Sequence, residues 1–336
     1  MKYLNRISLI FLILLIGAQV PVYSQGNLAQ SGANFLQIGV EPRGAALGGA
    51  VTALAEGAAA LYWNPAGAIH VENMDILLSH TDWFLDTKLM YGAIVKNLGS
   101  LGNVGLSVSS FYMDEMEITT VYASEGTGEF YESGDLAIGL SYARSLTDRF
   151  TFGATVKWVH EYIWNQKANQ VAFDVGSHYQ TDFYNLRLGI VIRNFAGKMK
   201  FSGDEIDERI QEELDANIDN NPRVERLTPE FRLPQIFRIG IAFDPIVYDS
   251  GKLTLIMDAD VPGDNEERLV FGTEYSFMNH FFLRGAYMLN YDEDDFSFGA
   301  GIDLNVININ ARFDYSYSSY SILDNVHRFG VGFALK

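Results

Sequence analysis

The chain of 336 residues contains no cysteine. This absence excludes a disulfide scaffold, a thiolate metal site and a cysteine nucleophile. Positive charge is scarce, because 24 lysine and arginine residues stand against 42 aspartate and glutamate residues, for a formal net charge of -18. Such a chain repels phosphate, so nucleic acid is not expected as a partner. Disorder is excluded by a composition that is 48% hydrophobic and 13% aromatic.

Recognisable catalytic motifs are also absent. The six histidines form no HExxH pair, and the sequence has neither a GxSxG elbow nor a GxxxxGK[ST] phosphate loop. Ser79-His80 and Ser177-His178 are neighbours in predicted strands, where adjacent side chains point to opposite faces. The acidic run 292–295 lacks the ligand spacing and the turn glycine of a calcium loop. We expect no enzyme, no cofactor and no metal site, with a barrel-borne lipid hydrolase as the alternative.

The only long apolar run lies at the N-terminus. Residues 7–18 follow Lys2 and Arg6 and precede small residues near Ser24, which is the pattern of a secretory signal peptide. A helix that crosses a bilayer needs about 20 apolar residues, so this shorter run is predicted to be cleaved near Ser24. The alternative is a retained anchor. Any membrane association of the mature chain must then come from strands.

From about residue 75 onward, apolar residues alternate with small or polar ones. In one such segment Phe296, Phe298 and Ile302 alternate with Ser297, Gly299 and Asp303, and this period of two is typical of strands with one apolar face. Fourteen segments between turn signals show it. The predicted strands cover residues 75–83, 88–97, 102–113, 133–146, 150–164, 169–181, 185–196, 234–244, 252–262, 268–278, 280–291, 295–305, 307–319 and 326–336.

The connections between these strands differ in length according to side. The connections after even-numbered strands are short, whereas 114–132 and 197–233 both follow odd-numbered strands. Outer-membrane barrels have an even number of strands and such unequal loops. We therefore predict an all-β fold, a 14-stranded antiparallel transmembrane β-barrel of the outer membrane, with 116–124 as a hairpin extension within a loop. A soluble β-sandwich or propeller is the alternative.

The polar face of the predicted strands points into the lumen. We interpret its charges chiefly as ion pairs that fill the barrel, and otherwise as a polar conduit or a surface that binds a passenger. The main candidates are Arg187, Arg193, Arg238, Glu274, Arg284, Arg312 and Asp314, and Lys157, Glu161, Asp258, Asp260 and Asp303 share their face. Tyr315, Tyr317 and Tyr320 are predicted to form part of an aromatic girdle at the membrane interface.

The loop 197–233 is long and acidic. Within it, apolar residues recur every fourth position near 204–218, which predicts a short amphipathic helix. A cap that rests on the barrel mouth is the plainer interpretation of this helix, and a partner-docking helix is the alternative. Because the loops carry so much acid, a partner at this mouth is expected to be neutral, cationic or bridged by metal.

Residues 25–73 differ from the rest of the mature chain. They are rich in glycine and alanine, predict a helix over Gly49–Ala60, and continue into the motif Tyr62, Trp63, Asn64, Pro65, Ala66 and Gly67. Pro65 excludes Asn64 from the helical region, so the chain must turn there. We predict a signal peptide over 1–24, a hatch or plug over 25–73 and the barrel over 74–336. A linker is the alternative for 25–73.

Several stretches resemble a known family. Residues 35–68 (FLQIGVEPRGAALGGAVTALAEGAAALYWNPAGA), 79–89, 136–164 and 186–195 are similar to the PorV/PorQ family of outer-membrane proteins, which in turn resemble the FadL transporters. The resemblance implies a 14-stranded barrel with an N-terminal hatch, and the Asn-Pro-Ala turn of that hatch matches residues 64–66. One departure is the C-terminus, which ends on Lys336 instead of an aromatic residue.

The resemblance also implies a function. PorV and PorQ serve type IX secretion, so we expect a non-enzymatic barrel that assists secretion or the surface attachment of cargo. Its partners would be outer-membrane lipid and either secretion-machinery proteins or cargo with a C-terminal sorting domain. The alternative is a FadL-like channel for hydrophobic small molecules, and a third hypothesis is a passive structural barrel.

Overall fold

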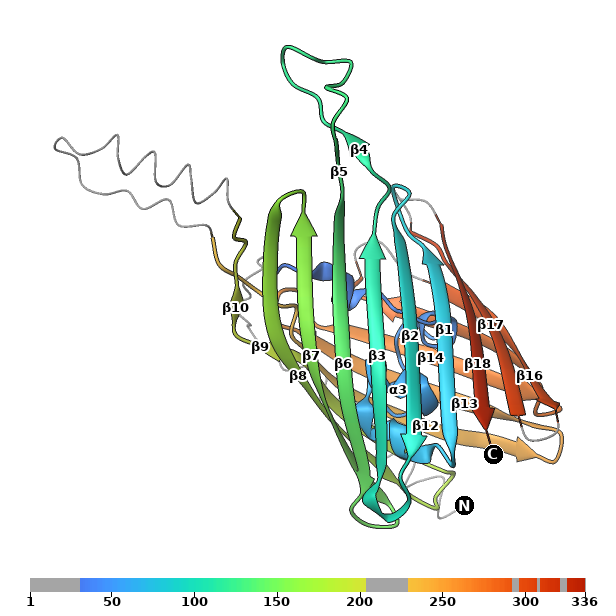
Figure 1. The fold of residues 1–336 in the computed structure, drawn as a ribbon. Coiled ribbons are helices and arrows are strands. Elements are labelled where there is room, and N and C mark those ends of the chain that lie inside the picture. The colour runs from blue at the N-terminus through green and yellow to red at the C-terminus, as the bar shows by residue number, and fades with distance from the viewer. Residues whose placement is uncertain (1–30, 204–228, 292–295, 307–308, 321–324, 336) are drawn as a thin grey trace.

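A computed structural model describes residues 31–203, 229–291, 296–306, 309–320 and 325–335. Within these residues, fourteen strands form a closed barrel and each pairs antiparallel with its two neighbours. The barrel closes where β1 (Met74–Asp82) pairs with β18 (Val326–Leu335) (Figure 1). The prediction of a 14-stranded antiparallel barrel is confirmed.

The remaining barrel strands follow the predicted segments closely. They are β2 (Lys88–Asn97), β3 (Asn103–Tyr112), β6 (Ser133–Ser145), β7 (Phe150–Ile163), β8 (Gln166–Gln180), β9 (Arg187–Ala196), β12 (Ile236–Tyr248), β13 (Gly251–Pro262), β14 (Arg268–Phe277), β15 (Phe281–Leu289), β16 (Phe296–Val306) and β17 (Ile309–Ser318). The largest difference is at β12, which continues past Pro245. Proline has no N–H group to donate to a neighbouring strand. The pairing of β12 with β13 shifts register between Phe243 and Ile246, so Pro245 is not required to donate.

The two ends of the barrel differ, as the connections predict. At the long-loop end, β4 (Met116–Glu117) pairs with β5 (Phe130–Tyr131) in a hairpin that projects beyond the barrel (Figure 1). Elsewhere on the same rim, beside β8, β10 (Lys198–Met199) pairs with β11 (Phe231–Arg232). At the short-turn end lie the tight connections, one of which contains η4 (Gly99–Leu101). The predicted helix near 204–218 and the acidic run 292–295 lie outside the described residues.

Side chains alternate across the barrel wall. Phe296 and Phe298 face outward and are about half exposed, while Ser297 between them is fully buried and donates to the carbonyl of Ala46 at 3.0 Å. The outward positions of the other strands are likewise mostly apolar, with leucine, isoleucine, valine and phenylalanine exposed around the barrel. Water would penalise such a surface, whereas a lipid bilayer favours it.

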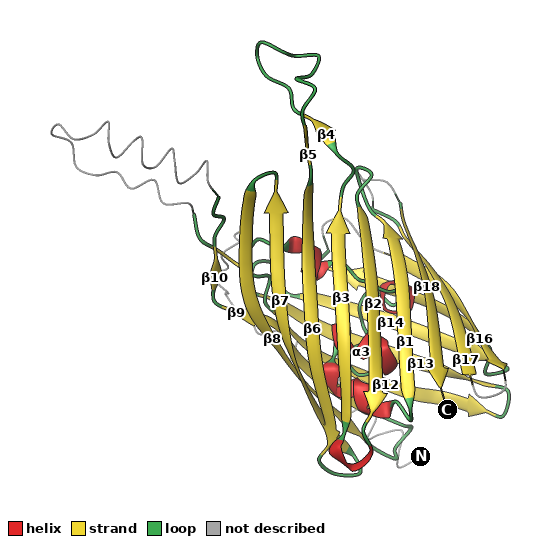
Figure 2. Cartoon of the chain, viewed as in Figure 1, coloured by secondary structure: helices red, strands yellow, loops and turns green. Residues whose placement is uncertain are grey.

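The plug segment, residues 31–73, occupies the lumen. Its helical turns are η1 (Asn34–Gln37), α2 (Pro42–Ala46), η2 (Gly57–Ala59), α3 (Ala60–Trp63) and η3 (Pro65–His70), drawn in red inside the barrel in Figure 2. The predicted helix over Gly49–Ala60 is wrong. Gly49 at φ 82° and Gly57 at φ 66° adopt left-handed conformations that interrupt a helix. No helix among the described residues is long and apolar enough to cross a membrane.

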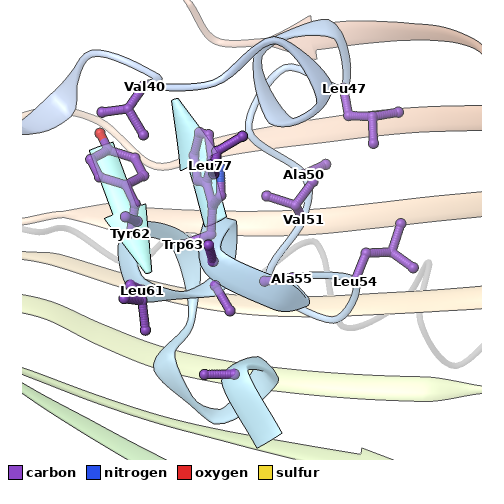
Figure 3. Packing of buried hydrophobic residues seen from close by; sticks show 14 of the residues in the cluster. Val40, Leu47, Ala50, Val51, Leu54, Ala55, Leu61, Tyr62, Trp63 and Leu77 are labelled. Carbon is purple, nitrogen blue, oxygen red and sulfur yellow. The ribbon is translucent and has the colours of Figure 1, made fainter. Parts of the chain in front are cut away.

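The hydrophobic core lies inside the barrel and is built largely from the plug segment. Val40, Leu47 and Leu61 are at most 2% exposed, and Trp63 packs edge-on against Tyr62 with ring centroids 4.8 Å apart. Figure 3 shows these side chains gathered around the plug helices. The inner wall contributes mainly small or branched residues to this cluster, so the bulk is supplied by the plug.

Candidate functional site

The motif around Asn64 forms a tight turn against the barrel wall. The side-chain oxygen of Asn64 accepts from the Ala66 amide at 3.2 Å, and its amide donates to the carbonyl of Thr52 at 2.8 Å. Pro65 begins η3, as its fixed φ favours. The wall opposite carries Gly176, where a β-carbon would come within 2.0 Å of the Asn64 oxygen. A side chain at this wall position is therefore incompatible with the turn.

The aromatic residues of the motif form hydrogen bonds with other parts of the plug segment. The Tyr62 hydroxyl donates to the carbonyl of Ile38 at 2.6 Å, and the Trp63 indole donates to the carboxylate of Glu41 at 3.0 Å. Glu41 also accepts from the amides of Arg43 and Gly44, which caps α2. Burial raises the pKa of Glu41, and nearby Asp314 adds to this effect, although Arg43 opposes it.

Three of the predicted lumen residues meet in one ion network. Arg284 Nε lies 2.7 Å from Glu274 and its Nη1 lies 2.5 Å from Asp314. The plug joins this network through Arg43, which binds both Glu274 oxygens at 2.9 and 3.1 Å and also pairs with Glu56 at 2.9 Å. Because Arg43 belongs to α2, the network joins the plug to the wall.

The other four predicted lumen residues are held separately. Arg312 pairs with Asp75 at 3.0 Å, Arg238 pairs with Asp260 at 2.7 Å, and Arg187 pairs with Asp244 at 2.6 Å. Arg193 instead stacks on Tyr62, with its guanidinium carbon 3.9 Å from the ring centroid. The ion-pair interpretation thus fits six of the seven, and Arg193 uses an aromatic face.

A bulge in the wall supplies a polar group that the alternation pattern missed. Arg193 and Asn194 are both 1% exposed, because Asn194 at φ 59° interrupts the alternation of β9. Asn194 accepts from Lys157 at 2.5 Å and donates to the carbonyl of Pro234 at 2.9 Å. An asparagine is among the few residues that tolerate this conformation, and it was the only local signal in the sequence.

A large cavity opens at the long-loop end, between the plug and the barrel rim. This vestibule has a volume of about 990 Å³. Its apolar and aromatic lining comprises Phe35, Ile38, Trp83, Phe111, Tyr291 and Tyr320, and its charged lining comprises Asp135, Glu161, Asp264 and Arg268. Tyr320 packs on Trp83 and Phe84, with centroids 5.7 and 5.0 Å apart. Its predicted place in the lipid-facing girdle is therefore wrong.

Smaller cavities lie at the opposite, short-turn end. Two of them, of about 180 and 220 Å³, share Glu56 and His70 of the plug segment as lining. His70 stacks on His178 of the wall with ring centroids 6.4 Å apart, and His178 contacts the carbonyl of Thr52 at 2.7 Å. No cluster of three or more potential metal ligands occurs in the part of the chain that the structure describes.

Comparisons with known proteins agree with this architecture. The model of an uncharacterised protein family, UPF0164, matches residues 24–160. No curated protein matches the chain. The toluene transporter TbuX of Ralstonia pickettii is 13% identical with a TM-score of 0.52, covering 88% of this chain and 97% of TbuX.

Two further solved structures are similar to the chain. The toluene transporter TodX of Pseudomonas putida is 14% identical with a TM-score of 0.53, over 92% of this chain and 98% of TodX. A FadL homologue of Pseudomonas aeruginosa is 11% identical with a TM-score of 0.52, over 88% of this chain and 96% of its own. At such identities the likeness concerns the fold, and the chain has the fold of a FadL-type membrane barrel.

Proposed function

We propose that this protein is an outer-membrane channel for small hydrophobic molecules. The observation that carries the proposal is the vestibule, a cavity of about 990 Å³ with aromatic walls above a plugged lumen. Cavities of this size are typical of small-molecule sites, and this one combines aromatic side chains, which can contact an apolar ligand, with a few charged ones, which can orient it. The barrel fold shared with two toluene transporters supports the same function. The long-loop end would then face outward.

Uptake of labelled toluene by Gram-negative host cells tests this proposal. Trp83 lines the vestibule, whereas Trp158 faces outward from β7 and is 41% exposed. Production of the protein should raise uptake above that of cells with an empty vector. The Trp83→Ala variant should lose several-fold of this gain and Trp158→Ala should keep it. Uptake that never exceeds the empty-vector level would contradict the proposal.

Passage along the lumen requires the plug segment to move. Between the vestibule and the cavities at the short-turn end lie fully buried side chains, among them Leu47 and Leu61. A β-carbon at Gly39 would lie 3.7 Å from that of Ala45, close to the mean of about 3.8 Å in disulfides. Because the chain has no cysteine, the double variant Gly39→Cys/Ala45→Cys adds one isolated pair.

This pair probes the movement. Oxidation should fix residues 39–45 and lower toluene uptake, and reduction should restore it. Each single-cysteine variant serves as the control, because it changes the same side chain without the cross-link. Full uptake by the oxidised protein would show that passage does not require residues 39 and 45 to move apart, because this cross-link lies within the plug and leaves the plug free to move as a unit.

The type IX secretion role implied by the PorV/PorQ resemblance is a second candidate. It is favoured by the hairpin of β4 and β5, which projects beyond the barrel and exposes Val121 and Tyr122 almost completely (Figure 1). Affinity purification of the tagged protein should then recover secretion components or cargo, and the double variant Val121→Ser/Tyr122→Ser should reduce their yield. Recovery of neither class would contradict this role.

A further inference from the structure

Two carboxylates on one wall of the vestibule face each other. Asp135 of β6 lies directly opposite Glu161 of β7 in the strand register, and both line the cavity. Like charges in directly opposed positions destabilise a sheet. Neither residue has an ion pair among the described residues. The pair is thus two opposed acidic groups that the described part of the protein leaves without a cationic partner.

The hydrogen bonds of Glu161 show that the site has unused acceptor capacity. Its Oε1 accepts from the amide of Ala33 at 2.9 Å. Its Oε2 is enclosed and has no hydrogen-bond partner among the described residues. A buried carboxylate oxygen without a donor is unfavourable, which lowers the cost of turning the Glu161 side chain into the cavity, where a ligand N–H group can reach this oxygen.

The floor of the vestibule contains a second acceptor of this kind. A smaller cavity of about 100 Å³ shares Arg268 and Tyr291 with the vestibule and is also lined by Asp260. Asp260 is only 4% exposed and pairs with Arg238 through Oδ2, yet its Oδ1 has no hydrogen-bond partner in the described part of the chain. This oxygen is independent of the Asp135 and Glu161 pair.

The cations of this region lie apart from the Asp135 and Glu161 pair, although Arg268 lines the same vestibule and its Nε has no hydrogen-bond partner among the described residues. Arg268 begins β14 across the barrel from β6 and β7, where its guanidinium carbon lies 4.5 Å from the Tyr291 ring centroid. Arg328 lines the floor and donates to the carbonyl of Gly39 at 3.1 Å and to Ser318 at 3.0 Å. The fourth carboxylate, Asp264, accepts from Ser31 and Gln37.

We infer that the vestibule selects hydrophobic molecules with a positively charged amine head over those with a carboxylate head, and that Asp135 and Glu161 hold the amine. This inference rests on the proposed function and names its class of substrate. Ammonium N–H groups would donate to the free oxygen of Glu161 and to Asp135. The apolar body would pack against Phe35 and Phe111. The faces of these two rings would also attract the positively charged head. A carboxylate head would meet like charge at the same wall.

Three probes with the same aromatic body test the inference. They are 2-phenylethylamine, 2-phenylethanol and 3-phenylpropanoate, titrated calorimetrically at pH 7 into the full-length protein in nonionic detergent. We expect the amine to bind about tenfold more tightly than the alcohol, and the propanoate to bind more weakly than the alcohol. High salt should narrow the difference between the amine and the alcohol.

Variants then assign the residues. Asp135→Asn/Glu161→Gln should bring the amine to within about twofold of the alcohol and leave the alcohol unchanged. The control Glu115→Gln/Glu129→Gln removes the same charge from the exposed loop that carries β4 and β5 and should leave the ratio intact. A preference for the amine that survives Asp135→Asn/Glu161→Gln would overturn the assignment.

The remaining outcomes separate this inference from the proposed function. Alcohol binding with no preference for the amine would overturn the charge selection and leave the channel proposal standing. Such a result would also indicate that the two carboxylates share a proton, as closely spaced acids do. Failure of every probe to bind, together with no toluene uptake, would overturn both.

Discussion

The acidic side chains in the middle of the lumen and those in the vestibule differ in their partners. In the middle, Glu274 is bound by Arg43 and Arg284, and hardly any of its surface is exposed. In the vestibule, Asp135 and Glu161 oppose each other, and neither forms an ion pair with another residue in the described part of the chain. Both regions belong to the same barrel wall and are built from the same alternating pattern. The difference lies in the partner that the plug segment supplies, because Glu274 meets the Arg43 guanidinium whereas Glu161 meets the neutral amide of Ala33.

This contrast distinguishes scaffold from binding surface. A buried ion pair must satisfy its own hydrogen bonds to offset the cost of leaving water. In the Arg43 network, hydrogen bonds accompany the ion pairs, so we interpret this network as the attachment of the plug to the wall. Charges that line an open cavity are under no such constraint, because water or a ligand can complete them. If the contrast is real, changes in the two regions should have effects of different size and even of opposite sign on stability.

The largest effect is expected in the middle network. Glu274→Gln keeps the size of the side chain but removes the charge on which Arg43 and Arg284 converge. Breaking a buried pair in this way costs about 3–5 kcal/mol of unfolding free energy. Urea unfolding followed by tryptophan fluorescence in detergent measures it. Glu72→Gln, at an exposed position of the short-turn end, is the control, and equal midpoints for the two variants would count against this attachment.

A smaller effect is expected where the plug touches the wall without charge. In Gly153→Ala the new β-carbon would lie 2.3 Å from the carbonyl carbon of Pro65, a backbone atom that yields only if the plug shifts. Overpacking of this kind costs about 1–3 kcal/mol. Faster proteolysis of the plug should accompany the loss of stability. Gly285→Ala, where the nearest atom is a Phe298 ring carbon at 3.5 Å, should be tolerated.

These contacts also show which features of the fold can be predicted from the sequence. Alternation predicts each strand, because Phe298 and Ser297 differ in polarity whatever their neighbours are. It predicts that Glu274 faces inward, but not that Arg43 meets it, since Arg43 lies in a segment with no period. The pairing of two distant segments depends on how the plug folds, and short helical turns leave no pattern over a window of ten residues or more.

Two other failures have local physical causes. Alanine-rich composition favoured a helix over Gly49–Ala60, but Gly49 at its start and Gly57 within it adopt left-handed conformations that exclude a continuous helix. At Asn194 a bulge turns two successive side chains inward, which a strictly alternating pattern does not predict.

Predicting the acidic pair of the vestibule would have required the register of β6 against β7, because only that register places Asp135 opposite Glu161. Sequence could place the acid near this mouth but not the opposed pair.

A pH-dependent effect is expected at Glu41. Because burial raises the pKa of Glu41 above its unfolded value, the protonated carboxyl stabilises the fold, and this contribution is lost as the pH rises through the raised pKa. Glu41→Gln removes the titration and one of the acceptors for the amides of α2, which costs about 1 kcal/mol. The margin in thermal midpoint between the wild-type protein and the variant should be largest near pH 4 and narrow towards pH 7. A margin that widens with pH would contradict the direction of the shift.

The smallest effect, and the one of opposite sign, is expected in the vestibule. Asp135→Asn removes one of two opposed negative charges, so it should raise the unfolding free energy by a few tenths of a kcal/mol, up to about 1 kcal/mol. The same urea titration that compares Glu274→Gln with its control measures this gain, and adding salt to the wild-type protein should reproduce part of it by screening the repulsion. A loss of stability on the scale of Glu274→Gln would mean that Asp135 has a cationic partner. The vestibule wall would then be scaffold, like the middle of the lumen, and its carboxylates would not be available to a ligand.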